Sequence, residues 1–125
     1  MPHPIPDNAR VKKKDGELTG PLSQQRTESY LGNLIDKNRE ANLKQALNDV
    51  FGGKGKATGP YRQDGQAVLH ASSGNGEKSV TVFYYISGQE AIVFAMGEHT
   101  GSNTYKVTDF GQPTGDFVEG ANIRL

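Results

Sequence analysis

A segment rich in proton-transferring and hydrogen-bonding side chains, "MGEHTGSNTY", spans residues 96–105. It places Glu98 next to His99, ends with Tyr105, and follows the apolar run "AIVFAM". The hydroxyl groups inside it belong to Thr100, Ser102 and Thr104. Histidine and glutamate commonly act as general acids and bases in enzymes. The segment is therefore typical either of an active site or of an ordinary polar loop.

A second histidine and four cations provide further groups for chemistry. His70 lies in the apolar segment 66–72, and Lys78 opens a later apolar segment. The other three cations lie in the glycine-rich segment 52–65, "GGKGKATGPYRQDG". We expect these cations to contact a phosphate group: Arg62, Lys78, Lys54 and Lys56. The segment lacks the G-x-x-x-x-G-K-[ST] pattern of a nucleotide-binding loop, so the other interpretation is a plain connection.

Two apolar stripes at helical spacing predict helices over residues 23–51. The stripes are out of phase and are separated by the polar run "DKNRE", so we expect two short helices or one helix broken near Asn38. Thr27 is a candidate N-cap. Gly52 and Gly53 are a strong stop signal, because glycine readily adopts the left-handed conformation that ends helices.

From residue 66 the pattern changes to segments rich in β-branched and aromatic residues, which predict strands. These segments span residues 66–72, 78–87, 90–98 and 105–111. Their short connections predict an antiparallel meander, to which "DFVEG" or "NIRL" in the tail adds a final short strand. We therefore expect an α+β fold, with an N-terminal helical hairpin packed on a four- to five-stranded antiparallel meander sheet.

The start of the chain differs from the rest in composition. Four of the six prolines lie in residues 1–22, next to the basic run "KKK" at residues 12–14. Few apolar residues are available there to offset the entropy lost on ordering. We expect residues 1–22 to be a flexible linker or leader, and residues 23–125 to form a single α+β domain. The basic run is either a solvated tail or an arm that contacts phosphates.

The predicted meander brings the candidate groups to one end of the sheet. His70 ends the first strand and Lys78 begins the second. Glu98 and His99 end the third strand, and Tyr105 begins the fourth. The two histidines would lie roughly 10 Å apart, two strand spacings, which suits imidazoles on either side of one phosphate. Whether His99 or Glu98 shares the face of His70 depends on the turns, because a shift of one residue exchanges them.

The composition excludes several classes of protein. Lys and Arg number 14, as do Asp and Glu, and this balance argues against indiscriminate binding to nucleic acid. The absence of cysteine excludes disulfides and thiolate metal sites. No apolar run approaches the roughly 18 residues of a membrane span, and the first residues lack the apolar core of a signal peptide. The H-E-x-x-H spacing of zinc enzymes is missing too, so we expect neither a metal nor a cofactor.

The order of elements and the motif around His99 resemble the RelE/YoeB-like ribonuclease toxins, and more broadly the barnase/EndoU/colicin/RelE group of toxin domains. In RelE-like proteins an apolar strand commonly runs into a glycine, a basic or histidine residue, a short loop and a tyrosine. Gly97, His99 and Tyr105 match this pattern. The resemblance covers roughly residues 27–111 as architecture. The chain departs from it in being neutral, and in having no arginine on the strand "EAIVFAM" before the histidine.

The resemblance implies a metal-independent endoribonuclease toxin. In such an enzyme a ribose 2′-hydroxyl attacks its adjacent phosphate and leaves a 2′,3′-cyclic phosphate, which requires a base, an acid and cations. We expect His99 to be the acid, and His70 or Glu98 to be the base. Tyr105 would orient the phosphate or stack on a nucleobase. The four cations named above would neutralise the phosphate charge.

The expected partners follow from the same resemblance: RNA, either tRNA or rRNA, and a cognate immunity protein or antitoxin. A proline-rich leader before a compact domain is similar to the C-terminal toxin module of a secreted carrier. The expected location is therefore the bacterial cytoplasm, or a target-cell cytoplasm reached by delivery. The rival hypothesis is a non-catalytic protein-binding module, such as an immunity protein or adaptor, because neutral charge and a polar sheet end suit it equally well. The loop at residues 97–104 would then recognise the partner.

Overall fold

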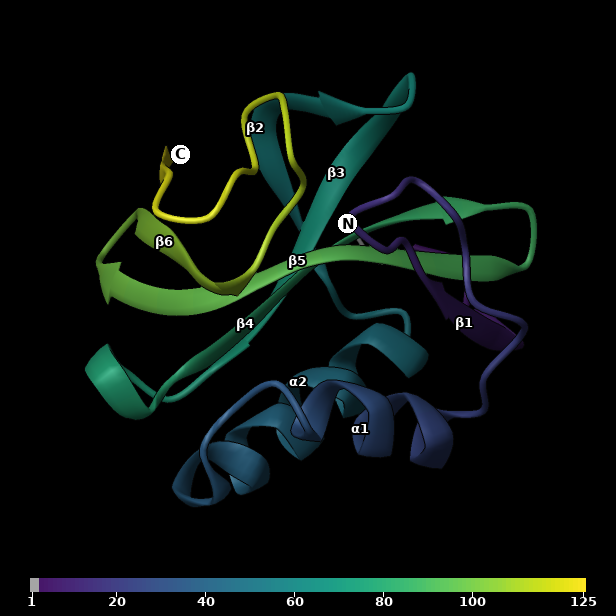
Figure 1. The fold of residues 1–125 in the computed structure, drawn as a ribbon, viewed down its shortest axis with the longest axis horizontal. Helices are drawn as coiled ribbons and strands as arrows, with labels where there is room; N and C mark the ends of the chain where they lie inside the picture. Colours follow the sequence, from purple (N-terminus) through teal and green to yellow (C-terminus); the bar gives the residue numbers. More distant parts are fainter. Residues whose placement is uncertain (1–2) are drawn as a thin grey trace.

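The computed structural model describes residues 3–125, which form one curved seven-stranded sheet with two helices against one face (Figure 1). Six strands follow one another in chain order, each antiparallel to the next. They are β2 (Lys56–Gln63), β3 (Gln66–Ser73), β4 (Val80–Ser87), β5 (Glu90–Gly101), β6 (Thr104–Phe110) and β7 (Asn122–Arg124). The seventh strand, β1 (Asn8–Val11), pairs in parallel with the first part of β5.

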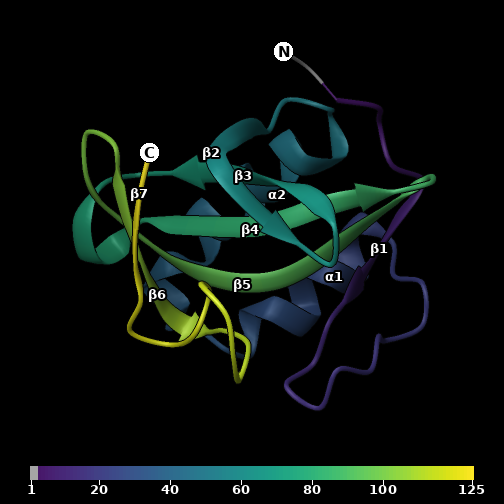
Figure 2. The ribbon, with the colours of Figure 1, turned by 90° about the horizontal axis from the view of Figure 1, so that it is seen from above.

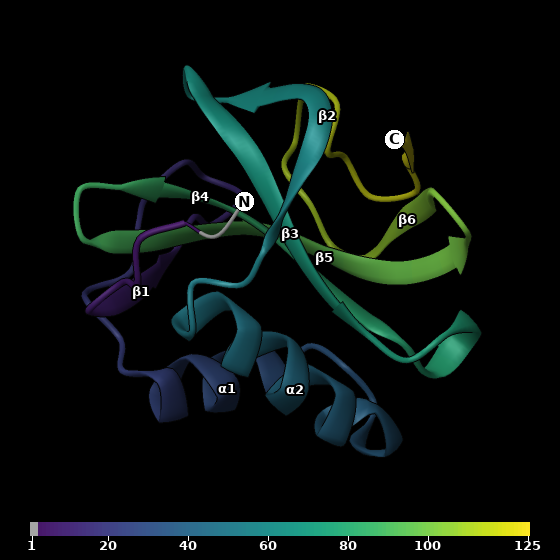
Figure 3. The same ribbon diagram turned by 180° about the vertical axis from the view of Figure 1, so that it is seen from behind.

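The expected fold class is wrong. Strands make up 43% of the residues and helices 22%, and the antiparallel strands curl into a nearly closed, barrel-like sheet. Figure 3 shows β2 and β3 crossing steeply over the middle of β4 and β5, unlike strands of a flat meander. The register shifts between Ala57 and Arg62 in β2, and between Phe83 and Tyr84 in β4. Such irregularities bend strands and increase the twist of a sheet, which accounts for the curl.

The four strands expected after residue 66 are present as β3, β4, β5 and β6, with their ends moved by at most three residues. The expected tail strand is present as β7, in the second of the two positions considered. The strand that was not expected is β2, in the glycine-rich segment that connects α2 to β3. No helix within residues 3–125 is long and apolar enough to cross a bilayer.

The region 23–51 contains two helices, α1 (Gln24–Gly32) and α2 (Glu40–Phe51), with the short 3₁₀ helix η1 (Lys37–Arg39) before α2. Thr27 is not the N-cap of α1, because Ser23 has that role and its side chain accepts a hydrogen bond from the Arg26 N–H. Thr27 is instead buried in the first turn of α1. The glycine stop signal is confirmed, since Gly53 has a φ of +71° directly after α2.

Two hydrophobic cores lie on the two faces of the sheet. Under the helices, Leu43 and Leu47 of α2 pack with Tyr84 and Val93 of the central strands. This core explains why both helices lie along the same face, as Figure 1 shows. The helices cover one face only, so the apolar side chains on the other face of the central strands need a different cover.

The inside of the curled sheet holds the second core. Phe117 lies in the segment that returns from β6 to β7, drawn in yellow in Figure 2. Its ring contacts those of Phe83 and Phe94, with centroids 5.1 Å apart in each pair. Tyr105 belongs to the same cluster. The inner core therefore reaches the polar segment that the sequence singled out.

The described part of the expected linker, residues 3–22, is joined to the sheet, and residues 1–2 lie outside the described residues. Ala9 and Val11 of β1 are buried. The backbone N–H of His3 donates a hydrogen bond to the carbonyl of Gly53, directly after α2. The basic run also has partners, since the ammonium group of Lys12 pairs with Asp64 at 2.7 Å.

Candidate functional site

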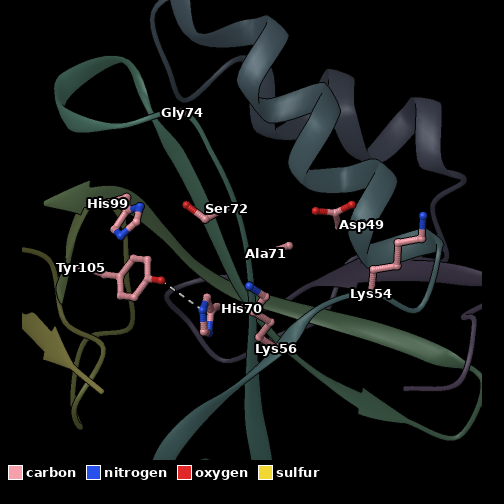
Figure 4. A pocket seen from close by; sticks show the side chains of 9 residues that line it. All are labelled: Asp49, Lys54, Lys56, His70, Ala71, Ser72, Gly74, His99 and Tyr105. Atoms are coloured by element: carbon pink, nitrogen blue, oxygen red, sulfur yellow. Dashed lines mark hydrogen bonds between the residues drawn. The ribbon is translucent and has the colours of Figure 1, made fainter. Parts of the chain in front are cut away.

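A pocket of about 210 Å³ opens beside β3, between the end of α2 and the β5–β6 hairpin (Figure 4). Its lining residues are Asp49, Lys54, Lys56, His70, Ala71, Ser72, Gly74, His99 and Tyr105. The pairing of β2 with β3 reaches only to Lys56 opposite His70, so Ala71–Ser73 extend past the end of β2. Because β2 does not extend alongside these residues of β3, there is room for the pocket beside them.

His70 lies inside the pocket and is 4% exposed. Its Nδ1 is 2.9 Å from Thr58 Oγ1 and its Nε2 is 3.2 Å from the Tyr105 hydroxyl, so both ring nitrogens have protein partners. Burial lowers the pKa of His70 to about 4, and the positive charges of Lys56 and His99 contribute to the same shift. The imidazole is therefore neutral at neutral pH, with one nitrogen donating and the other accepting.

Tyr105 lies between the two histidines. Its ring stacks on that of His99, with centroids 4.6 Å apart and an interplanar angle of 16°. On the other side, its centroid is 4.9 Å from that of His70. Burial raises the pKa of Tyr105, so its phenol stays protonated and can donate a hydrogen bond.

The Nε2 atom of His99 is buried, and no group of residues 3–125 forms a hydrogen bond with it. A buried polar atom left without a partner costs about 1–3 kcal/mol. Nδ1 of His99 forms no hydrogen bond with residues 3–125 either, so the imidazole of His99 is the ring of the site that is free to bind or protonate a ligand.

The strand register settles which group shares the face of His70. His99 and Tyr105 stand directly opposite each other in β5 and β6, and both line the pocket. Successive side chains of a strand point to opposite faces. Glu98 consequently lies on the helix side of the sheet, where its charge contributes to raising the pKa of Arg39. His99, and not Glu98, joins His70.

A buried ion pair supports the strand that carries His99. Arg39 donates two hydrogen bonds to the carboxylate of Asp109, at 2.7 and 2.8 Å. Arg39 also donates to the carbonyl of Ser79 at 2.9 Å. The hydroxyl of Ser79 in turn accepts the backbone N–H of His99 at 2.8 Å. This series of contacts fixes the backbone beside the pocket, although Arg39 itself does not line it.

Two of the four expected phosphate-binding cations lie at the pocket. Lys54 and Lys56 line it, both are exposed, and neither forms a salt bridge within the described part of the chain. Arg62 lies instead near the β2–β3 turn, where it donates to the carbonyl of Gly65. Lys78 is in the 3₁₀ helix η2 (Gly76–Lys78) and does not line the pocket.

The hydroxyl groups expected from the polar segment do not line the pocket either. Thr100 donates to Thr104 across the β5–β6 hairpin at 3.1 Å, and Ser102 is exposed at the turn. Besides the Tyr105 phenol, the pocket lining has the hydroxyl of Ser72 in β3, which is 2.8 Å from Thr81 Oγ1.

Asp49 is a residue of the site that the sequence reasoning missed, and it is the one acidic side chain in the lining. It lies in the last turn of α2, which ends at Phe51. A negative charge is unfavourable at the C-terminal end of a helix. An acidic residue just before a glycine stop signal could have drawn attention to it.

Within residues 3–125, no group of three or more His, Asp or Glu side chains is arranged to hold a metal ion. No protein-family model, curated protein or solved structure matches this chain. The resemblance to RelE-like toxins therefore stays a prediction, and the function has to be argued from the pocket.

Proposed function

We propose that the protein is a metal-independent endoribonuclease, which cleaves RNA and leaves a 2′,3′-cyclic phosphate. The observation that supports this proposal is the convergence of two imidazoles, a phenol and two free ammonium groups in one pocket. These groups belong to His70, His99, Tyr105, Lys54 and Lys56. Transfer of a phosphate ester needs proton donors and acceptors near the reacting oxygens, and cations near the phosphate.

In this reaction the ribose 2′-oxygen forms a bond to phosphorus, and the bond from phosphorus to the 5′-oxygen breaks. The 2′-hydroxyl loses a proton and the 5′-oxygen gains one. His99 donates the proton to the 5′-oxygen, because its imidazole, unlike that of His70, forms no hydrogen bond with residues 3–125. The proton of the 2′-hydroxyl passes to the oxygen of Tyr105, while the phenol proton passes to His70 Nε2. For this transfer His70 carries its own proton on Nδ1, where the N–H donates a hydrogen bond to Oγ1 of Thr58.

The pKa of His70, about 4, makes its imidazole a weak proton acceptor. Most of the acceleration therefore comes from His99 and from Lys56. Lys56 stands opposite His70 in the β2–β3 register, so its charge lies on the side of the pocket that holds the histidines. His70 acts through Tyr105 and is a positioning residue. Glu98, on the other face of the sheet, has no part in the reaction.

The toxin setting belongs to the proposal as well, and its support is the match of Gly97, His99 and Tyr105 to the RelE-like pattern. In that setting the substrate is tRNA or rRNA, and a cognate immunity protein or antitoxin protects the producing cell. The site of action is a bacterial cytoplasm, reached from within or by delivery on a carrier.

The test is incubation of the purified protein with total tRNA and rRNA in EDTA. The wild type should give discrete fragments with 2′,3′-cyclic ends. His99→Gln should slow cleavage by about 10²–10⁴-fold, the usual effect of losing general acid catalysis. Ser102→Ala is the matched control, because Ser102 lies in the same hairpin but is exposed and outside the pocket. Equal cleavage rates for the wild type and His99→Gln would contradict the proposal.

A second candidate function is a non-catalytic protein-binding module, such as an immunity protein or adaptor. The observation that favours it is the closed network of His70 with Thr58 and Tyr105, in which both ring nitrogens already have protein partners. In that case neither the wild type nor His99→Gln cleaves RNA. A partner protein bound by the wild type would be lost from His99→Gln and kept by Ser102→Ala.

A further inference from the structure

An unpaired carboxylate lies in the pocket. Asp49 lines it from α2, and no group of residues 3–125 forms a salt bridge with its side chain. The partial negative charge at the C-terminal end of α2 disfavours a carboxylate in the last helical turn. Neither the helix end nor a salt bridge stabilises the charge of Asp49 at this position, which leaves its carboxylate oxygens available to a ligand in the pocket.

The histidines and Asp49 occupy different sides of the pocket. Figure 4 shows His70, His99 and Tyr105 on one side, and Asp49 with Lys54 on the other, with Ser72 and Ala71 between them. The phosphate belongs on the histidine side, where Lys56 stands opposite His70 in the strand register. A carboxylate repels a phosphate. Asp49 is therefore placed to contact the nucleobase, which is the uncharged part of the nucleotide.

We infer that Asp49 selects guanine, whose N1–H and N2–H groups donate to the two carboxylate oxygens. This inference rests on the proposed ribonuclease function and adds the substrate class. An ionised carboxylate only accepts hydrogen bonds, and two parallel bonds to it give both strength and direction. Guanine is the RNA base with two adjacent donors on its Watson–Crick edge. Adenine, cytosine and uracil each have only one donor group on that edge, and an acceptor stands next to it.

The pocket also requires the guanine to be unpaired. Its volume of about 210 Å³ is below the roughly 300–1,000 Å³ of sites for drug-sized ligands, so it suits one base and not a base pair. In a duplex the Watson–Crick edge is occupied, whereas in loops and single strands proteins read this edge directly. The substrate class is therefore single-stranded RNA that contains guanine.

The test uses sixteen oligothymidylates that each carry one central ribonucleotide X followed by one deoxynucleotide Y. Each oligonucleotide has a single 2′-hydroxyl and therefore a single cleavable bond. The wild type should cleave those with guanine at one of the two positions about tenfold faster than the rest, as one bidentate contact allows. Asp49→Asn should abolish this preference by slowing cleavage of the guanine substrates, because an amide replaces one of the two acceptors with a donor.

Asp116→Asn is the matched control, because Asp116 is exposed and lies outside the pocket. A thermal unfolding temperature of Asp49→Asn at or above that of the wild type shows that the variant is folded. Equal cleavage of all sixteen substrates by the wild type would overturn the inference and leave the ribonuclease function intact. An equal loss on all sixteen in Asp49→Asn would overturn it too, because Asp49 would then serve proton transfer.

If the wild type cleaves no substrate, the proposed ribonuclease function is wrong. The inference about guanine can then be tested separately by measuring nucleotide binding. Calorimetry with guanosine 3′-monophosphate and adenosine 3′-monophosphate then compares the two affinities. A preference for the guanosine nucleotide that Asp49→Asn removes would support the inference. Equal affinities in the wild type would overturn it.

Discussion

Tyr105 stacks on His99 with ring centroids 4.6 Å apart, and its hydroxyl lies 3.2 Å from Nε2 of His70. One side chain thus links the two histidines of the pocket, one through its ring and the other through its oxygen. The two contacts can be separated experimentally, because removal of the hydroxyl leaves the ring in place.

Tyr105→Phe should therefore keep the stack on His99 and remove the partner of His70 Nε2. A buried polar atom left without a partner costs about 1–3 kcal/mol, and the free energy of unfolding should fall by that amount. Urea denaturation measures the change. Tyr61→Phe is the control, since the partly buried Tyr61 ring packs on Phe117. An equal fall in the free energy of unfolding in both variants would show that the Tyr105 hydroxyl does not stabilise the protein through its contact with His70.

The second prediction concerns the pH dependence of stability. In the folded protein the pKa of His70 is about 4, against an ordinary value of 6.5, because the ring is buried. Between these two values the unfolded chain binds a proton that the folded chain does not, so the stability contributed by neutral His70 is full above about pH 6.5 and is lost as the pH falls to 4. The loss should be about 3 kcal/mol.

Denaturation curves of the wild type and of His70→Gln at pH 4 to 8 test this prediction. Carboxylates also titrate at the acidic end, so the difference between the two proteins isolates the contribution of His70. This difference should narrow by about 3 kcal/mol from pH 7 to pH 4. Parallel curves would show that His70 is not buried in its neutral form.

The third prediction concerns the ion pair beneath the site. The side chains of Arg39 and Asp109 are 7% and 10% exposed. Arg39→Met leaves the Asp109 carboxylate buried without its partner, which should lower the free energy of unfolding by about 3–5 kcal/mol. Lys14→Met is the control, because the Lys14–Glu119 pair is exposed and pairs of that kind contribute about 0–1 kcal/mol.

The double variant Arg39→Met with Asp109→Leu should recover part of that loss, because it leaves no charge buried. Guanidinium chloride denaturation of the single and double variants gives the coupling between the two positions. If the losses of unfolding free energy in the two single variants add up to the loss in the double variant, the two side chains do not interact energetically.

The sequence predicted an element correctly where the residues of that element carry the pattern typical of its structure. The segments that became β4 and β5 are apolar at successive positions, which predicts central strands covered on at least one face by the helices. Their two faces do carry separate cores, one under the helices and one inside the curled sheet. His99 and Tyr105 were found from the sequence as well, because one short hairpin joins them and local pattern places both near its turn.

Elements that depend on distant partners were missed. β1 pairs with β5 from Asn8 to Glu90, 82 positions away (90 − 8), and its own segment has few apolar residues. β2 contains Gly59 and Pro60, which strands disfavour, and it exists because β3 lies beside it. With β2 added at one end of the sheet and β1 added beside the first part of β5, the expected small meander became a curled sheet. Asp49 reaches the pocket through the packing of α2 on β3, so its place before the glycine stop signal marks it as unusual but does not show that it lies beside the histidines.

The position of β2 at one end of the sheet has a consequence for how the protein behaves at high concentration. An open strand edge can pair with another chain and start aggregation. Here that edge carries Pro60, which has no N–H to donate, and Gly59, whose φ of +53° interrupts the regular strand. The exposed charges of Lys56 and Arg62 lie on the same strand. The apolar strands β4 and β5 have neighbours on both edges, so other chains cannot pair with them. Other chains can reach the edge of β2, and the features of that edge oppose the growth of a cross-β stack.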